Sequence, residues 1–275
     1  MPGVDAGQLA RGGVPGQSVA RDRMFAMRWV YLSPHPDDAA LCAGGLIFEQ
    51  VLAGEIVEIW TLMSGVPKGA RLSEFAAEMH SKWSTTSAEQ TAHLRREEDR
   101  RAARILGAKI VHFDFMDAIY RTAPDGTALY GDPVGAPLHP DDAALSLQIR
   151  EVLAARLESH ARIVSLLGIG DHVDHVIVRS AVEKTGLPVH YVADFPYVLR
   201  HPQSLHAKAG GLGLTWKAIS EAGIAAWIAG VEAYGSQLGA VFEELEPRTA
   251  IRDYCQRNRG VRVWHGAGLD SGGEP

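Results

Sequence analysis

The chain has 275 residues, of which 46% are hydrophobic, and a formal net charge of -6 at pH 7. This size and apolar content allow a sizeable core, and we expect one folded domain rather than two. The negative net charge provides no general attraction to nucleic acid or to anionic lipid, so we expect neither nucleic acid nor a membrane as a partner.

Cysteine usage and the absence of long apolar runs bear on the cellular compartment. Cys42 and Cys255 lack the spacing of a zinc knuckle or of a disulfide framework, which favours a reducing compartment. No apolar run approaches the roughly 18 residues of a membrane span, and residues 1–24 lack the apolar core of a secretory signal. We therefore predict a cytoplasmic protein, and the sequence leaves its oligomeric state open.

The two ends of the chain differ from its middle. Residues 1–25 are glycine-rich and polar, and residues 266–275 are rich in glycine, serine and acidic residues. We expect a disordered N-terminal tail and a flexible C-terminal tail. Residues 26–265 contain no internal repeat and no linker, so we predict that they form a single α/β domain.

Short apolar runs alternate with helical patterns along most of this domain. The strands are predicted at residues 27–32, 56–63, 109–115, 162–167 and 187–193. The helices between them are predicted at residues 39–52, 88–107, 140–160 and 176–184. A helix between two strands favours a right-handed crossover to a parallel neighbour. The alternation therefore predicts a three-layer α/β/α sandwich with a Rossmann-like, mostly parallel sheet.

Three further stretches have weaker patterns. Residues 64–86 combine glycine, proline and serine/threonine with a short amphipathic piece, and this segment is either a lid over a site or a surface excursion. Near the C-terminus, residues 212–219 are predicted to be extended, and residues 224–241 and 247–257 to be helical.

The first chemically informative loop follows the first predicted strand and reads His35-Pro36-Asp37-Asp38. An imidazole and a carboxylate three residues apart can close on one divalent ion when the chain turns between them. The intervening carboxylate is then free to act on a bound water. Asp37 and Asp38 also stand just before a helical run, where carboxylates are favoured as helix caps. Both readings fit the two aspartates, and His35 favours the metal site.

A second histidine-rich loop follows the fourth predicted strand and contains His172, Asp174 and His175. The two histidines are three residues apart at the start of a helix, so they share one face. Ligand sites in open parallel sheets form outside the carboxyl ends of the strands, so the two loops can meet. His35, Asp38 and one of the later histidines would then provide three ligands and an open position, the pattern of a catalytic zinc site.

Three ordered motifs between residues 27 and 200 carry a family resemblance. They are Ser33-Pro34-His35-Pro36-Asp37-Asp38, then Arg95-x-x-Glu98-x-x-x-Ala102-x-x-x-Leu106-Gly107, then His172-x-Asp174-His175. Together they resemble the motifs of the PIG-L/LmbE-like family of zinc-dependent N-deacetylases. The chain has Ala39 where many members have a glutamate after the two aspartates, which leaves the mechanism intact but the substrate open.

The resemblance implies a division of roles at the site. It assigns Zn2+, or another divalent transition metal, to the ligands His35, Asp38 and His175. Asp37 would be the general base, and His172 would stabilise the oxyanion or supply a proton. Asp174 would orient or charge His172.

Four other residues are candidates to contact the substrate. They are Arg95, Arg121, Asp194 and Tyr197. The alternative for Arg95 is a surface ion pair with Glu98 at i,i+3 spacing, worth a few tenths of a kcal/mol. For the loops around Arg121 and Tyr197, the alternative is a plain turn with packed aromatic side chains.

The resemblance implies an enzyme, a metal-dependent N-deacetylase, with a small N-acylated molecule as its partner. The acyl group is expected to be acetyl, and the substrate an N-acetylglucosamine-type or related aminosugar derivative. Two alternatives stay open. The chain could be a zinc amidase acting on a non-sugar amide, such as a thiol conjugate or a natural product, or a noncatalytic binding domain that retains the fold.

Overall fold

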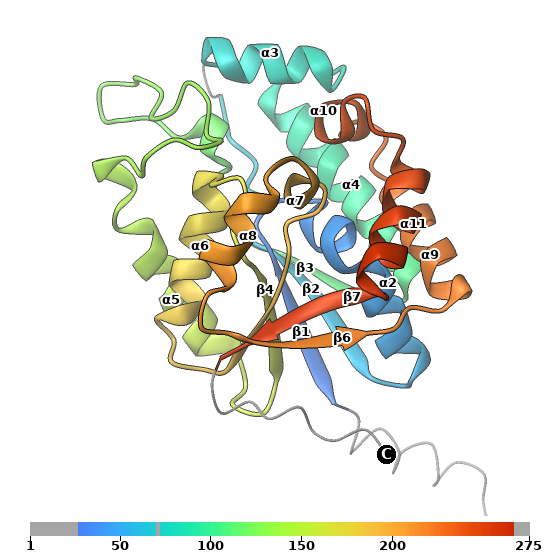
Figure 1. Ribbon diagram of the computed structural model, residues 1–275. Helices are drawn as coiled ribbons and strands as arrows, with labels where there is room; N and C mark the ends of the chain where they lie inside the picture. Colours follow the sequence, from blue (N-terminus) through green and yellow to red (C-terminus); the bar gives the residue numbers. More distant parts are fainter. Residues whose placement is uncertain (1–26, 70–71, 267–275) are drawn as a thin grey trace, which may run out of the picture.

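The computed structural model describes residues 27–69 and 72–266, so the tails predicted at residues 1–25 and 266–275 lie almost entirely outside the described residues. A seven-stranded sheet forms the centre of the described part, in the order β3-β2-β1-β4-β5-β7-β6 (Figure 1). The strands are β1 (Arg28–Ser33), β2 (Ile56–Thr61), β3 (Lys109–His112), β4 (Arg162–Leu166), β5 (Val189–Val192), β6 (Gly213–Lys217) and β7 (Val261–His265). The five strands from β3 to β5 are parallel, whereas β7 and β6 are joined antiparallel.

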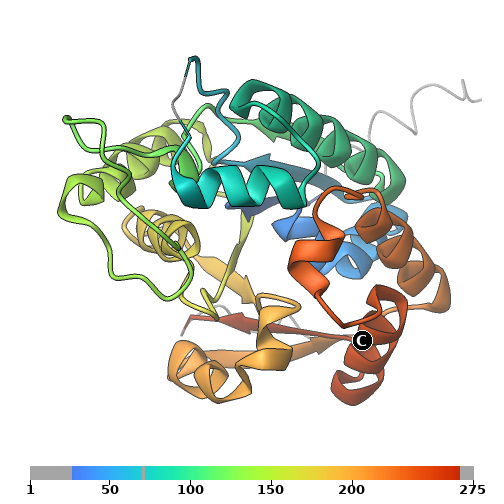
Figure 2. The same ribbon diagram turned by 90° about the horizontal axis from the view of Figure 1, so that it is seen from above.

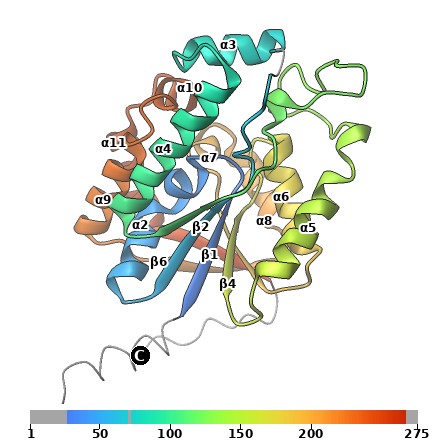
Figure 3. The same ribbon diagram turned by 180° about the vertical axis from the view of Figure 1, so that it is seen from behind.

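Helices cover both faces of the sheet. They are α2 (Asp38–Leu52), α3 (Glu74–Lys82), α4 (Ala88–Leu106), α5 (Leu145–Arg156), α6 (Val173–Glu183), α7 (Tyr197–Arg200), α8 (Pro202–Ala209), α9 (Glu221–Glu232), α10 (Leu238–Phe242) and α11 (Pro247–Asn258). Helices α2, α4, α9 and α11 lie on one side, and α5, α6 and α8 lie on the other (Figures 1 and 3). The predicted three-layer, mostly parallel α/β fold is confirmed. No described helix has the length and apolar character needed to cross a membrane.

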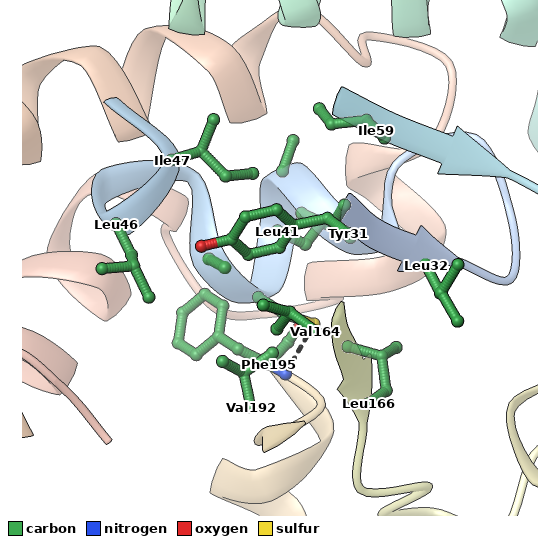
Figure 4. Close-up of a cluster of buried hydrophobic side chains, with 14 of the residues drawn as sticks. Tyr31, Leu32, Leu41, Leu46, Ile47, Ile59, Val164, Leu166, Val192 and Phe195 are labelled. Carbon is green, nitrogen blue, oxygen red and sulfur yellow. Dashed lines mark hydrogen bonds between the residues drawn. The ribbon is translucent and has the colours of Figure 1, made fainter. Parts of the chain in front are cut away.

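The first strand runs through the middle of the apolar core. Tyr31 is almost fully buried, and Figure 4 shows its ring between Ile47 of α2, Ile59 of β2 and Phe195. Its hydroxyl donates a 2.7 Å hydrogen bond to Gln50 Oε1, so the buried polar atom is satisfied. Burial on both faces is typical of a parallel strand covered by helices on each side. The packed strand therefore determines the position of the loop that follows it, which contains His35.

The sheet has a topological switch point between β1 and β4. The chain winds from β1 to β2 and β3 in one direction, and from β4 to β5 in the other, while β1 and β4 pair in parallel. Connections that start in opposite directions leave a crevice outside the carboxyl ends of the two strands. The loops after β1 and β4 are those that carry the two histidine motifs.

The C-terminal third differs from the prediction in two respects. Strand β7 was not predicted, although Val261 and Val263 are buried where it inserts between β5 and β6. The helix predicted at residues 224–241 is instead the two helices α9 and α10, separated by a turn at residues 233–237. Five residues of strand pattern are a weak local signal, and pairing with β5 and β6 is decided by contacts distant in sequence.

Candidate metal centre

The two histidine loops meet at the carboxyl edge of the sheet. Asp38 Oδ2 lies 3.2 Å from His35 Nδ1 and 3.3 Å from His175 Nε2, and all three side chains are buried. The loop after β1 contributes His35 and Asp38, and the first turn of α6 contributes His175. Residues predicted from separate parts of the sequence therefore converge on one point.

The donor set at this point fits a divalent metal ion. Tetrahedral zinc has nitrogen and oxygen ligands at about 2.0–2.1 Å, which places the ligand atoms about 3.3 Å from one another. The two distances around Asp38 match this separation, and they are longer than a strong charge-assisted hydrogen bond. Nitrogens of His35, His172 and His175 also lie within 4.8 Å of one another. Imidazole nitrogen with carboxylate oxygen suits zinc and other divalent transition metals.

The hydrogen bonds of His35 and His175 to two carboxylates leave the other nitrogen of each ring facing Asp38. His175 Nδ1 lies 2.8 Å from Asp194 Oδ1, and His35 Nε2 lies 2.9 Å from Asp174 Oδ2. An ionised carboxylate only accepts, so each of these nitrogens carries the hydrogen. The opposite nitrogen of each ring faces Asp38. Against the effect of burial, Asp117 and Asp174 raise the pKa of His35, and Asp38 and Asp194 raise the pKa of His175 to about 10, so without a metal ion both rings carry a second hydrogen. A metal ion at this point would replace that hydrogen and leave each ring in the neutral state that a metal ligand requires.

His172 has the reverse arrangement. Its Nδ1 accepts a 3.2 Å hydrogen bond from the backbone N–H of Asp174 and so caps α6. Burial, together with the neighbouring His35 and His175, holds the pKa of His172 well below its usual value, so the ring is neutral. Its one hydrogen must then be on Nε2, which makes that nitrogen a donor rather than a metal ligand. This tautomer distinguishes His172 from His175.

Asp37 occupies the cap position of α2 but does not act as a cap. Its φ is 131°, and its side chain makes no capping hydrogen bond. Such a conformation costs on the order of 1–3 kcal/mol and is concentrated at functional sites. No described residue donates a hydrogen bond to its carboxylate, and Arg95 Nη2 lies 3.6 Å from Oδ2. Burial and the neighbouring Asp38 raise the pKa of Asp37 to about 8, which suits a base near neutral pH.

A cavity of about 120 Å3 opens above these groups. His35, Asp37, Asp38, His172 and His175 line its floor. Its upper wall is apolar and is formed mainly by Phe75, Met79, Trp83, Ile119, Val134, Ala240 and Val241. Helix α3, from the segment interpreted as a lid or a surface excursion, lies across this end of the molecule (Figures 1 and 2).

Two of the four predicted substrate contacts line the cavity. Arg95 lies at its wall, where Nη1 donates a 3.0 Å hydrogen bond to Asp117 Oδ2, and Tyr197 packs against the ring of His175. The alternative of an Arg95–Glu98 ion pair is not observed, since Glu98 bonds to a different loop. The second motif thus directs its arginine to the site.

The other two predicted contacts, Arg121 and Asp194, do not line the cavity. Arg121 Nη1 forms a 2.6 Å ion pair with Asp174, and Asp194 is fully buried against His175. Asp194 bonds directly to His175, whereas Arg121 contacts Asp174, which in turn bonds to His35. The Asp174 carboxylate also differs from the expectation: it bonds to His35 and to the backbone N–H of Ala118, and only its backbone N–H reaches His172.

Several cavity residues were not among the predicted contacts, and three of them are polar or contact Arg95. Asp117 bonds to Arg95, Trp83 stacks over the Arg95 guanidinium at 5.0 Å, and Gln237 lies in the turn between α9 and α10. Asp117 follows a strand end, which is a usable signal. Gln237 carried none, because the sequence pattern placed it inside a continuous helix.

The chain matches the PIG-L family, described as GlcNAc-PI de-N-acetylase, over residues 30–185. It is 25% identical over 204 residues to 2'-N-acetylparomamine deacetylase of Niallia circulans, covering 64% of this chain and 70% of that protein. The protein of the same name from Streptomyces fradiae is 27% identical over 188 residues, covering 64% of this chain and 60% of that one.

Solved structures agree in fold. A teicoplanin-pathway deacetylase superimposes with a TM-score of 0.78 at 24% identity, over 87% of this chain and 97% of that one. The A40926 pseudoaglycone deacetylase superimposes with a TM-score of 0.68 at 26% identity, over 87% and 96% of the two chains. Because the family match spans more than half of the 275 residues and contains both histidine motifs, the chain belongs to the PIG-L family of de-N-acetylases.

Proposed function

We propose that this chain is a zinc-dependent N-deacetylase that removes the acetyl group from the nitrogen of an aminosugar-type substrate. One observation carries the proposal: around one cavity, His35 and His175 each turn a ring nitrogen toward Asp38, His172 caps α6 through its Nδ1, and the Asp37 carboxylate has no hydrogen-bond donor among the described residues. The sugar rests on the curated relatives, whose names identify deacetylases of 2'-N-acetylparomamine.

The proposed metal ligands are His35, Asp38 and His175. When bound, a divalent ion there supplies Lewis acidity, which polarises the amide carbonyl and lowers the pKa of water. Asp174 and Asp194 accept hydrogen bonds from the other nitrogen of His35 and of His175, so with an ion bound the nitrogen that faces Asp38 would be free to ligate it.

The remaining steps use groups of the chain. Asp37 accepts a proton from the attacking water as the water oxygen bonds to the acyl carbon. His172 donates its Nε2–H to the carbonyl oxygen, where negative charge develops. Asp37 then returns the proton to the leaving nitrogen as the C–N bond breaks, which yields acetate and a free amine. Arg95 stays beside Asp37 and favours its charged form.

Release of free amine with and without metal tests the proposal. The purified chain is depleted of metal with a chelator, reloaded with zinc, and assayed on N-acetylglucosamine, 2'-N-acetylparomamine and N,N'-diacetylchitobiose. We expect amine release from at least one sugar, loss of turnover on depletion, and recovery with zinc. Zinc-loaded protein that releases amine only from non-sugar amides would contradict the proposed aminosugar substrate. Equal activity without metal would contradict the proposed metal-dependent mechanism.

The apolar upper wall favours a second candidate substrate, an N-acetylated natural product with a large apolar portion. Phe75 and Met79 face the same cavity as the polar floor. A ligand that covers them would remove apolar surface from water, worth roughly 25 cal/mol per Å2. Tighter binding of N-acetylglucosaminides with longer alkyl aglycones would support this candidate.

A further inference from the structure

Glu98, the second charged residue of the Arg-x-x-Glu motif, has no part in the proposed mechanism. Its side chain is only 4% exposed, and it turns away from Arg95 toward the turn between α9 and α10. There Oε1 accepts a 2.8 Å hydrogen bond from the backbone N–H of Ser236, and Oε2 accepts a 2.6 Å bond from the Ser236 hydroxyl. A buried carboxylate on a catalytic-domain helix thus holds a loop 138 residues away.

These bonds determine the orientation of the next side chain, Gln237. The Ser236 hydroxyl has one hydrogen, and it donates this hydrogen to Glu98, because an ionised carboxylate only accepts. The Ser236 oxygen can therefore only accept from Gln237, so the amide atom that lies 2.7 Å away is Nε2. The carbonyl oxygen Oε1 must be the outer end of the amide.

That outer end belongs to a residue that lines the cavity above the metal centre. Gln237 is 3% exposed, and no described residue donates a hydrogen bond to its Oε1. This oxygen is not one of the fully buried unpaired atoms, so a ligand in the cavity that carries a donor can reach it. The other cavity residues on this side, Ala240 and Val241, are apolar and have no side-chain donor to offer.

We propose that Gln237 Oε1 accepts a hydrogen bond from a hydroxyl of the sugar ring that carries the N-acetyl group, and that Glu98 positions this amide through Ser236. The inference rests on the proposed function. It makes Gln237 a specificity-determining residue and Glu98 a positioning residue. An acceptor held in one orientation selects substrates with a hydroxyl at the matching ring position over those that lack it.

The test compares the wild type with Gln237→Leu on methyl N-acetylglucosaminide and on its 3-, 4- and 6-deoxy analogues. We expect the wild type to lose about 10- to 100-fold in kcat/KM on one deoxy analogue. Gln237→Leu should lose the same factor on the parent sugar, mainly through KM, and should not discriminate the parent from that analogue. Thermal unfolding and zinc content serve as folding controls.

Glu98→Gln tests the positioning role. A glutamine at position 98 can donate a hydrogen bond to the Ser236 hydroxyl. The serine can then donate its own hydrogen to Gln237 Oε1, and the Gln237 amide can rotate so that Nε2 faces the cavity. We expect higher KM on the parent sugar, loss of the same hydroxyl discrimination, and an unchanged kcat. The matched control is Glu97→Gln, because this neighbour is exposed and pairs only with Arg100 and Arg104 among the described residues.

The outcomes separate the two hypotheses. A wild type that releases amine neither from these four sugars nor from the three sugars of the first assay would overturn the proposed function, and this inference with it. If the wild type is active, the losses in kcat/KM from Gln237→Leu and from removal of each hydroxyl are compared. Losses that simply add for every hydroxyl would mean that Gln237 contacts none of them, which would overturn the inference alone. If Gln237→Leu keeps the wild-type KM and hydroxyl discrimination, Gln237 does not contact the sugar. If Glu98→Gln keeps them, Glu98 does not position Gln237.

Discussion

The loop after β1 and the loop after β4 each place a histidine and an aspartate at the start of a helix, and each contains a non-glycine residue at positive φ. These residues are Asp37, with φ 131°, and Asp171, with φ 55°. In the first loop the side chain at the cap position makes no capping bond, whereas in the second loop His172 caps its own helix. Similar sequences thus present different chemical groups to one cavity.

The difference shows that a helix cap determines which side-chain atoms remain available to the cavity. An uncapped helix start leaves the Asp37 carboxylate free of hydrogen-bond donors and open to water. The cap made by His172 occupies Nδ1 and so directs the ring hydrogen to Nε2, toward the cavity. On this basis we expect the first loop to provide a base and the second a donor. Four substitutions test this contrast.

The largest effect is expected within the first loop, from Asp37→Asn. An amide cannot accept the proton, so kcat should fall about 10^2- to 10^4-fold while zinc content stays at the wild-type level. Asp38→Asn, its neighbour, should lose the metal. Metal analysis of the two purified variants beside their kinetics distinguishes them, and loss of zinc from Asp37→Asn would show that the base is misassigned.

A somewhat smaller effect is expected in the second loop, from His172→Gln. Removal of one donor to a developing oxyanion costs about 10^2- to 10^3-fold in kcat. Because this ring is assigned as a donor, the variant should keep its zinc, whereas His175→Gln should not. The reverse result, with metal lost from the first variant and kept by the second, would overturn the tautomer assignment.

Asp174→Asn tests the support that links the loops, since this residue of the second loop bonds to His35 of the first. Loss of a carboxylate that orients a ligating histidine weakens metal affinity about 10- to 100-fold. Competition with a chelator measures the change. Asp171→Asn is the matched control, because Asp171 is exposed and pairs with Lys208. Equal zinc affinities in Asp174→Asn and Asp171→Asn would show that Asp174 does not orient His35 for metal binding.

The smallest effect is expected from Arg95→Gln and appears in the pH profile. Burial and Asp38 raise the pKa of Asp37 to about 8, and Arg95 lowers it. The base must be deprotonated, so activity is lost as the pH falls through this pKa. Without the arginine the pKa rises, and the acid limb of kcat/KM should move to higher pH. Arg100→Gln, on the exposed face of α4, should leave the limb in place.

The two histidine loops could be predicted because their signals are local. His35 and Asp38 lie in one turn after an apolar strand, and His175 lies one helical step from His172. Spacing of this kind specifies which side chains share a face, whatever the rest of the chain does. The alternation of strands and helices likewise predicted the parallel sheet and therefore that the two loops would meet.

The supporting contacts could not be predicted, because they join distant segments. Asp194 was expected to contact the substrate and instead bonds to His175, and the partner of Glu98 is a serine 138 residues away. Gln237 reaches the cavity only because the predicted helix breaks at residues 233–237.

Local spacing and periodicity are properties of a short stretch of chain, so the sequence by itself determined the fold class, the two histidine loops and the residue types available at the site. Which nitrogen of each histidine is hydrogen-bonded depends on carboxylates and backbone groups around it. Only the tertiary structure decided this, because hydrogen bonds between distant segments exist only once the core has packed.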